Sequence, residues 1–416
     1  MTAASVRRRY LVLIGLRWLQ TGLLIPVIAL LMVSRGLSLV EIGIVGSVSG
    51  LVILVLELPT GGLSDALGRR PTLVLAYLFA FAGLLTLFLA QSLAGFLISA
   101  VLTAIFRALD SGPLEAWFVD ETHAVAPDAR IETGLAAGSS VLSLAIAGGA
   151  LLAGALIALD PVESVAPFDL AVLVALAISV INLVTVLLLM RETRHGRGAG
   201  AVVASVRAVP TVVREGFGLL RDSRVLTALI GVELFWGFAI VAFETLFPIR
   251  LAEVVGGTTE AGALMGPISS GAWFAAAAGA AGIAVLSRWT GVAGAALMLR
   301  LLQGATIVLM GVLAGVLGLV TAYLACYLTH GASNPMHTTL LHREVTAAHR
   351  TTVLSLNSMV FHPAAAIGAL VLTAIATGSS LSTAMVVGGL VCAVAAPLYL
   401  PAWRAERERQ RSTATA

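Results

Sequence analysis

The residues best placed to do chemistry are charged side chains that interrupt long apolar runs. Within the run at 95–119, Arg107 and Asp110 lie three residues apart, so a helix would place both on one face. At 1.5 Å per residue, Arg107 would lie about 18 Å from either end of that helix. A charge at the centre of a bilayer costs about 3 kcal/mol unless it is paired or hydrated. The pair is therefore predicted either to bind a proton or a substrate, or to form a neutral structural ion pair.

A second pair of charges lies in the first two apolar runs, at 10–33 and 39–60. Glu57 would sit about 7 Å from the inner end of its helix, and Arg17 would lie at a similar depth in the preceding one. Opposite charges at one depth lower the cost of burying each other. A structural ion pair between Arg17 and Glu57 is therefore expected, and both residues are also candidates for proton coupling or substrate binding.

These charges stand out because the chain carries few of them. Of its 416 residues, 59% are hydrophobic and 11% are charged, whereas soluble proteins have about a quarter charged residues. This composition excludes a soluble enzyme, a nucleic-acid-binding protein and a disordered chain. The apolar runs are continuous rather than alternating, which excludes a membrane barrel. The sequence predicts an all-α polytopic membrane protein in a lipid bilayer.

Twelve apolar runs are predicted to span the membrane. They lie at 10–33, 39–60, 72–91, 95–119, 136–158, 168–190, 225–250, 261–286, 292–314, 318–341, 351–376 and 381–402. Each has about the 20 residues that a spanning helix needs. A central cytoplasmic loop at 191–224 separates an N-terminal six-helix bundle, 1–190, from a C-terminal six-helix bundle with a short tail, 225–416. Two equal groups of six helices suggest a duplicated transporter.

The arginines predict how the chain is oriented. All 25 basic residues are arginine, and three of them fall inside predicted spans. With the N-terminus in the cytoplasm, 20 arginines fall in cytoplasmic segments and two, Arg35 and Arg250, fall outside. Basic residues are enriched on the cytoplasmic side of membrane proteins. The sequence therefore predicts a multi-pass protein of the cell membrane with both termini in the cytoplasm.

The central loop contains an apolar pattern of its own. Four of its residues recur at helical spacing: Val209, Val213, Phe217 and Leu220. Arg214 and Arg221 lie seven residues apart on the same stretch. This pattern favours an amphipathic helix on the cytoplasmic membrane surface that starts at Pro210. The alternative is a solvated linker.

A glycine-rich and charged motif follows the second run. Residues 61–70 read Gly-Gly-Leu-Ser-Asp-Ala-Leu-Gly-Arg-Arg. This resembles the loop signature of the major facilitator superfamily, G-x-L-[AS]-D-x-x-G-R-[RK], and departs from it at Ala66, where a basic residue is usual. Together with the six-plus-six pattern, the resemblance covers essentially the whole chain. It implies the major facilitator fold and transport by alternating access.

The resemblance also implies a conformational lock at the cytoplasmic face. The residues that would form it are Gly61, Asp65, Gly68, Arg69, Arg70 and an acid at the inner end of the fourth helix, Asp120 or Glu121. In the superfamily, this loop is thought to clamp the outward-open state through contacts at the helix ends. The alternative is that the acids only balance nearby arginines.

Two further segments resemble the drug-efflux branches of the superfamily. The segment 57–61 resembles E-x-P-T-G, and the segment 350–355 resembles the R-x-T-V-L-S start of the eleventh helix. The predicted fifth helix has Gly148, Gly149 and Gly154 but no proline, so it departs from the G-P-x-x-G-G signature of one group of antiporters.

The resemblance adds further candidates, because helices one, four, seven and ten line the cavity in this superfamily. These candidates are Arg17, Glu233, Glu244, His330, Asn334 and His337. The last three share one helix face, and imidazole changes charge near neutral pH. They are expected to act in proton coupling or substrate binding, or to form hydrogen bonds between helices. A metal site on them is a weaker alternative.

No nucleotide-binding loop, metal-ligand cluster or catalytic triad spacing is found in the sequence. We therefore expect no cofactor, and an ion gradient, most simply of protons, as the source of energy. The sequence predicts a monomeric, proton-coupled antiporter for the efflux of small hydrophobic or drug-like molecules, with Asp110 carrying the proton and Arg107 tuning it. The alternatives are a proton-coupled importer of a small metabolite, and a polytopic membrane enzyme or lipid-handling protein.

Overall fold

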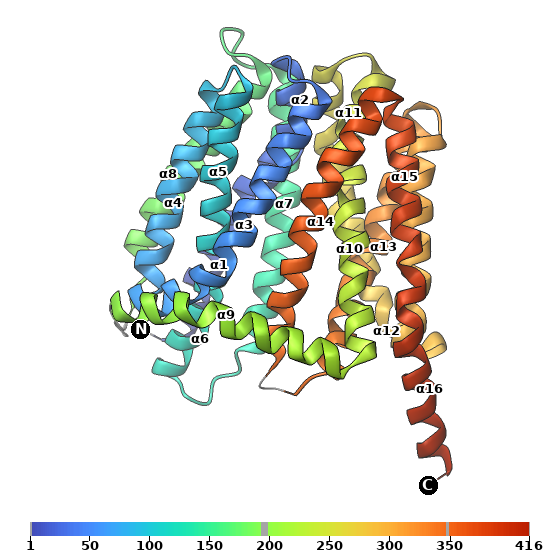
Figure 1. The fold of residues 1–416 in the computed structure, drawn as a ribbon. Helices are drawn as coiled ribbons and strands as arrows, with labels where there is room; N and C mark the ends of the chain where they lie inside the picture. Colours follow the sequence, from blue (N-terminus) through green and yellow to red (C-terminus); the bar gives the residue numbers. More distant parts are fainter. Residues whose placement is uncertain (1, 193–198, 347–348, 416) are drawn as a thin grey trace. The chain divides into compact units, whose positions relative to one another are not determined.

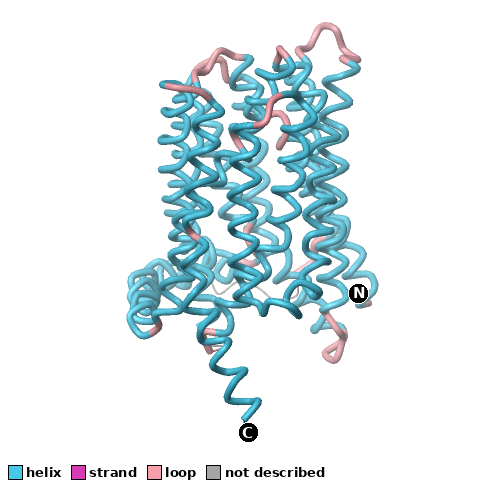
Figure 2. The backbone as a smooth tube through the Cα atoms, turned by 90° about the vertical axis from the view of Figure 1, so that its right-hand side faces the viewer, coloured by secondary structure: helices cyan, strands magenta, loops and turns pink. Residues whose placement is uncertain are grey.

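The computed structural model describes residues 2–192, 199–346 and 349–415, and this part of the chain consists of helices joined by short loops (Figure 2). Eleven of the described helices are long and apolar enough to cross a membrane. This confirms the prediction of an all-α membrane protein. The predicted span at 261–286 is helical as part of α12 (Thr258–Val312), but it is not one of the eleven.

The chain forms two compact units. Unit 1 comprises Met1–Leu37, Val48–Val209 and Gly257–Ser270, and unit 2 comprises Ser38–Ser47, Pro210–Gly256 and Gly271–Ala416. The predicted boundaries at 190 and 225 did not anticipate two segments. The start of α3 (Leu39–Leu67) belongs to unit 2, and the start of α12 belongs to unit 1.

Unit 1 is built around its first helix. Besides most of α3, its helices are α1 (Ala3–Leu24), α2 (Ile28–Ser34), α4 (Arg69–Leu89), α5 (Leu93–Asp110), α6 (Pro113–Val125), α7 (Glu132–Leu159) and α8 (Pro167–Leu189) (Figure 1). Helix α1 packs along α7 and α8, and α4 packs along α5 and α8. The core includes Tyr10 of α1, whose ring stacks on Phe118 of α6 at 4.4 Å between centroids.

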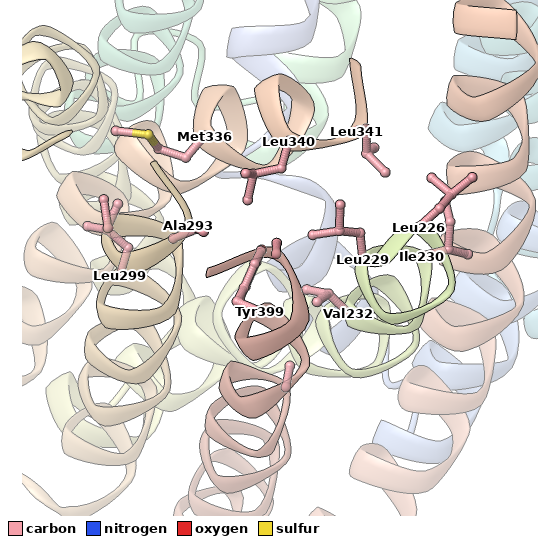
Figure 3. Close-up of a cluster of buried hydrophobic side chains, with 14 of the residues drawn as sticks. Leu226, Leu229, Ile230, Val232, Ala293, Leu299, Met336, Leu340, Leu341 and Tyr399 are labelled. Atoms are coloured by element: carbon pink, nitrogen blue, oxygen red, sulfur yellow. The ribbon is translucent and has the colours of Figure 1, made fainter. Parts of the chain in front are cut away.

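Unit 2 has its own core. Its helices are α10 (Arg224–Glu244), α11 (Leu246–Val255), most of α12, α13 (Gly315–Arg343), α14 (Arg350–Gly378), α15 (Leu381–Val394), the short η2 (Ala396–Tyr399) and α16 (Leu400–Thr415). Figure 3 shows Leu229 and Val232 of α10 near Tyr399 and Leu340, in a cluster of buried apolar side chains. Helix α10 packs along α14 and α15.

Small residues bring helices into close contact. Leucine side chains gain little from leaving lipid, so helix association in membranes depends on close van der Waals packing. In unit 1, a Cβ atom added to Gly154 of α7 would lie 2.7 Å from the Cα atom of Gly266 in α12. In unit 2, Ser47 of α3 donates a hydrogen bond to the carbonyl of Ala366 in α14 at 2.7 Å. The start of α12 therefore packs closely against α7 in unit 1, and the start of α3 is hydrogen-bonded to the backbone of α14 in unit 2.

Three apolar spans are each broken into two helices: α1 with α2, α5 with α6, and α10 with α11. Each break has a proline at or just after it: Pro26, Pro113 and Pro248. A proline has no N–H and cannot bond to the carbonyl four residues earlier, so it interrupts or ends a helix. As a result, Asp110 and Glu244 are the last residues of α5 and α10, inside their spans.

The central segment is helical, as the amphipathic pattern predicted. Helix α9 runs from Ala199 to Asp222, with Pro210 inside it, so the predicted start at Pro210 is wrong. The side chains of Val209, Val213 and Phe217 lie outside the described part of the structure. Leu220 packs against the core of unit 2, and Arg214 is exposed. The helix is therefore amphipathic along its described C-terminal part.

Candidate functional site

Unit 1 holds a buried ion pair at the break between α5 and α6. The Nε atom of Arg17 in α1 donates to Oδ2 of Asp110 at 2.5 Å, and the two side chains are 10% and 8% exposed. The Nη1 atom of Arg17 also donates to the hydroxyl of Thr21 at 2.5 Å. These contacts join residues 93 positions apart at the end of a half-helix. We call Arg17 and Asp110 the unit 1 centre.

Aromatic rings and the helix end both stabilise the arginine. The guanidinium carbon of Arg17 lies 4.1 Å from the ring centroid of Trp18 and 5.2 Å from that of Phe106, within the range of cation–π attraction. Asp110 ends α5, where the helix dipole is negative and favours a nearby cation. Arg17 therefore has favourable surroundings besides the carboxylate itself.

The pair of Arg17 with Asp110 was not among those expected from the sequence, which placed Arg107 beside Asp110 and Glu57 beside Arg17. The ion pair that forms joins Arg17 to Asp110, while Arg107 is exposed and Glu57 is half-buried on α3. The physical reason is the helix break: Asp110 is the final residue of α5, and the neighbouring helix α1 supplies its counter-charge.

Unit 2 holds a buried polar network around His337 of α13. Its Nε2 atom lies 3.3 Å from Oε1 of Glu233 in α10 and 3.2 Å from Oδ1 of Asn357 in α14. Its Nδ1 atom lies 3.0 Å from the hydroxyl of Tyr399 in η2. The Glu233 and His337 side chains are 7% and 3% exposed. We call Glu233, His337, Asn357 and Tyr399 the unit 2 centre.

A buried arginine adjoins the unit 2 centre. Arg300 of α12 interacts electrostatically with Glu233, and its Nη1 atom donates to Oε1 of Gln303 at 2.9 Å. The Nε2 atom of Gln303 lies 3.4 Å from Nδ1 of His330, whose ring stacks on Trp236 at 5.1 Å. The charge of Arg300 is thus opposed by that of Glu233.

The predicted face of three residues on α13 does not act as one cluster. His330 contacts Gln303 and Trp236, and His337 contacts Glu233 and Asn357, while Asn334 between them is exposed. The side chains share a broad face of the helix, but they meet different neighbouring helices. A metal site on all three is therefore not formed. No group of three or more metal-binding side chains occurs among the described residues.

Glu244 occupies the break in the seventh predicted span. Its carboxylate Oε1 accepts a hydrogen bond from the hydroxyl of Tyr327 in α13 at 3.0 Å, and the residue is exposed. Tyr327 contacts the rings of Phe243, Tyr323 and Trp273. The acid thus lies at the edge of an aromatic cluster, and like Asp110 it ends a half-helix.

The loop motif of unit 1 is held by an acid that sequence analysis missed. Glu192, just after α8, accepts hydrogen bonds from the backbone N–H groups of Arg69 at 2.8 Å and Arg70 at 3.2 Å, at the start of α4. Gly68 has φ +98, and a Cβ atom there would lie 2.8 Å from the carboxylate. The Nη2 atom of Arg69 lies 3.2 Å from Oδ2 of Asp120. Asp120, one of the two acids proposed for the lock, thus contacts Arg69.

Unit 2 repeats this arrangement at residues 291–293, where the sequence shares only a glycine with the motif of residues 61–70. Glu406 of α16 accepts hydrogen bonds from the N–H groups of Val292 at 3.2 Å and Ala293 at 3.0 Å. Gly291 before them has φ +74, and Arg343 lies 2.9 Å from Glu406. Glu192 comes just after the last span of unit 1, and Glu406 lies near the end of the last span of unit 2. This shared position is the sequence signal that would have identified both acids.

Two residues of the predicted lock lie outside the described side chains. Helix α3 runs through Gly61 and Asp65, but the structure describes no side-chain contacts at either position. The role of Asp65 therefore stays a prediction. Arg300 and Tyr399 were not selected from the sequence, although a charge inside the run at 292–314 was a visible signal for Arg300.

The chain is similar in sequence and in fold to known transporters. The family model described as Major Facilitator Superfamily matches residues 10–362. No curated protein sequence matches the chain.

Solved structures match nearly the whole chain. The nucleoside transporter NupG has a TM-score of 0.77 at 11% identity, covering 95% of this chain and 98% of its own. A POT family transporter in complex with a thioalcohol-conjugated peptide has a TM-score of 0.70 at 17% identity, covering 96% and 95%. A bacterial homolog of the human lysosomal transporter Spinster has a TM-score of 0.72 at 14% identity, covering 96% and 97%. At these identities the likeness establishes the fold.

Proposed function

We propose that this chain, which belongs to the major facilitator superfamily, is a proton-coupled antiporter that exports small hydrophobic or drug-like molecules by alternating access. Members of this superfamily are secondary transporters rather than enzymes, so the alternative of a membrane enzyme no longer applies. The observation that carries the proposal is the buried ion pair of Arg17 and Asp110 at a helix break.

Asp110 is the proposed carrier of the coupling proton. When Asp110 is ionised, the pair with Arg17 is neutral and the 2.5 Å contact is a charge-assisted hydrogen bond. When a proton binds the carboxylate, the attraction is lost and the centre gains one positive charge. Arg17 then keeps its contacts with Trp18, Phe106 and Thr21. Proton binding thus changes the charge of the centre, while the guanidinium of Arg17 keeps three stabilising contacts.

The direction of transport is supported by sequence features. The segments 57–61 and 350–355 resemble the efflux branches, and an exporter uses the inward proton gradient to drive its substrate outward. The distribution of arginines supports a cell-membrane orientation with both termini in the cytoplasm. We propose that the protein works as a monomer, because each unit contains its own buried polar centre.

The loop motif is the proposed conformational lock. Arg69 contacts Asp120, and Glu192 holds the start of α4, so the cytoplasmic ends of three helices are tied together. The proposed lock comprises Gly61, Asp65, Gly68, Arg69, Arg70 and Asp120. Its breaking and forming would favour one state of the alternating-access cycle over the other.

The proposal is tested in everted membrane vesicles with an acidified lumen. An exporter would load its substrate into the lumen as protons leave. We choose three probes: ethidium as a hydrophobic drug-like molecule, uridine as a nucleoside and dialanine as a peptide. We expect ethidium to accumulate and to dissipate the pH gradient, and Asp110→Asn to abolish both effects.

Two outcomes would overturn parts of the proposal. Accumulation of uridine or dialanine without ethidium would keep proton-coupled export but replace the substrate class. Uptake in right-side-out vesicles alone, driven by an inward proton gradient, would establish the alternative of an importer. Equal dye movement with and without a pH gradient would overturn proton coupling itself.

A further inference from the structure

Arg35 is one of the two arginines that the charge pattern predicts to lie outside the cell, and its side chain is buried rather than solvated. It follows the last residue of α2 directly, and its side chain is 8% exposed. A charge that leaves water is stable only when it is paired and hydrogen-bonded. The position of Arg35 therefore requires partners that replace its hydration.

The guanidinium of Arg35 is bound by two neighbouring elements of unit 1. Its Nη1 atom donates to the carbonyls of Leu87 at 2.7 Å and Ala90 at 2.6 Å, and its Nη2 atom donates to that of Phe88 at 2.9 Å. Nη2 also donates to Oδ1 of Asp169, in the first turn of α8, at 2.5 Å. The last carbonyls of an α-helix have no partner within the helix. One side chain thus joins the end of α2 to the end of α4 and the start of α8.

The other end of α2 is a break in the helix at residues 25–27. Pro26 has no N–H and cannot donate the backbone hydrogen bond that would continue α1 into α2. Between the break and Arg35, the side chains of Leu30 and Leu31 are buried. Apolar packing has no preferred direction, whereas hydrogen bonds do. The four bonds of Arg35 therefore fix where the end of this seven-residue helix lies.

The partners of Arg35 keep other stabilising contacts when the guanidinium leaves. The carbonyl of Leu87 also accepts a hydrogen bond from the N–H of Ala90, at 3.4 Å. Asp169 lies at the start of α8, where the helix dipole stabilises a carboxylate, and its side chain is 25% exposed. Water can hydrate this carboxylate once the ion pair opens. The contacts of Arg35 are thus of a kind that can break and form again.

We propose that α2 is a hinged flap of unit 1, and that Arg35 is the latch that holds the flap closed against α4 and α8. Opening breaks the four hydrogen bonds of Arg35 and turns α2 about residues 25–27, while the other helices of the unit keep their places. The latch lies at the end of α4 opposite to the loop of residues 61–70, so the flap is a movable element where the proposed lock does not reach. The proposal depends on neither the coupling proton nor the substrate.

The first test measures amide hydrogen exchange of the full-length protein in lipid nanodiscs, without substrate. Wild type is compared with Arg35→Gln and with Arg250→Gln. Arg250 is the other arginine predicted outside, and it donates to Glu253 of its own helix at 2.6 Å, so it serves as the matched control. We expect exchange in residues 28–36 to rise about tenfold or more in Arg35→Gln, because the loss of one charge-assisted hydrogen bond shifts an equilibrium by about that factor. Arg250→Gln should leave these residues unchanged.

Two milder variants grade the latch and cover the case in which Arg35→Gln does not fold. Asp169→Asn keeps the three carbonyl contacts of Arg35 and should raise exchange in residues 28–36 by a smaller factor. Arg35→Lys keeps the charge but lacks the planar fork that binds several acceptors at once, so its effect should fall between those of wild type and Arg35→Gln.

The region that responds separates a latch from a general structural tie. A latch raises exchange in residues 28–36 and leaves α4, α5 and α8 as in the wild type. Unchanged exchange in residues 28–36 in Arg35→Gln, or in Asp169→Asn if Arg35→Gln does not fold, would overturn the proposal. An equal rise in all helices of unit 1 would also overturn it, because Arg35 would then hold the whole unit together rather than one flap.

Discussion

The polar centres of the two units hold their charges in different ways. In unit 1, Arg17 and Asp110 form an ion pair beside two aromatic rings, at the end of a half-helix. In unit 2, Glu233 and His337 share a network with Asn357 and Tyr399, and the buried Arg300 adjoins Glu233. A proton on Asp110 removes the attraction that holds its partner.

This difference indicates different roles for the two centres. Loss of an ion pair changes the relative energy of two arrangements of α1 and α5, which is what coupling to a conformational change requires. We therefore expect substitutions in the unit 1 centre to affect both folding and coupling strongly.

The largest effect on stability is expected for Arg17→Ala. It leaves the carboxylate of Asp110 buried without this guanidinium, and breaking a buried pair costs about 3–5 kcal/mol. Thermal unfolding in detergent measures the loss. Arg107→Ala is the matched control, because Arg107 is exposed on the same helix as Asp110 and should cost about 0.5 kcal/mol. Equal losses in both variants would contradict the pairing.

The two glutamates that cap helix starts should have intermediate and similar effects. Glu192→Ala and Glu406→Ala each remove an acceptor of two backbone hydrogen bonds, which predicts a loss of about 2 kcal/mol in the free energy of unfolding. Glu408→Ala, exposed on α16, is the control. If only Glu192→Ala destabilised the protein, the two units would not share this device.

Asp65→Asn tests the lock separately from folding. We expect a folded protein with impaired transport, because a change of about 1.4 kcal/mol shifts the ratio of two states tenfold. Spin labels or fluorophores on the helix ends that flank residues 61–70 measure the populations of the two states. Normal turnover with unchanged populations would exclude Asp65 from the lock.

The smallest effect is expected where aromatic rings support an arginine. Trp18→Leu removes the ring that lies 4.1 Å from the buried Arg17 and should cost about 0.5–1 kcal/mol beyond the change in packing. In unit 2, Arg407 lies 3.7 Å from the ring of Trp403, but this arginine is exposed. Because water weakens the attraction, Trp403→Leu should cost less. The reverse order of thermal stabilities would refute this argument.

The sequence predicts the helical class of the fold well, because apolar runs and composition are local properties. The prolines at the helix breaks, Pro26, Pro113 and Pro248, are also visible in the sequence. The pairing of Arg17 with Asp110 is different. Estimates of depth place many charges near the same level, and they do not show which helices are neighbours or how each is rotated.

The capping glutamates were hidden for another physical reason. Glu192 and Glu406 bind backbone N–H groups, so their partners need no particular side chain. In unit 2 the partners are Val292 and Ala293, and Gly291 is the residue that matches the motif of residues 61–70. Gly291 has a positive φ of +74, as Gly68 has in unit 1, so both helix starts share a backbone conformation that the side-chain pattern does not reveal.

The central claim is that Asp110 carries the coupling proton, and the most direct test compares two variants in everted vesicles. Asp110→Asn leaves Arg17 charged, whereas the double variant Arg17→Gln/Asp110→Asn removes both charges and should recover most of the lost stability. The account predicts that neither variant accumulates ethidium against its gradient in response to an acidic lumen, while both still exchange it downhill. Proton-driven accumulation by the stable double variant at the wild-type level would contradict the account.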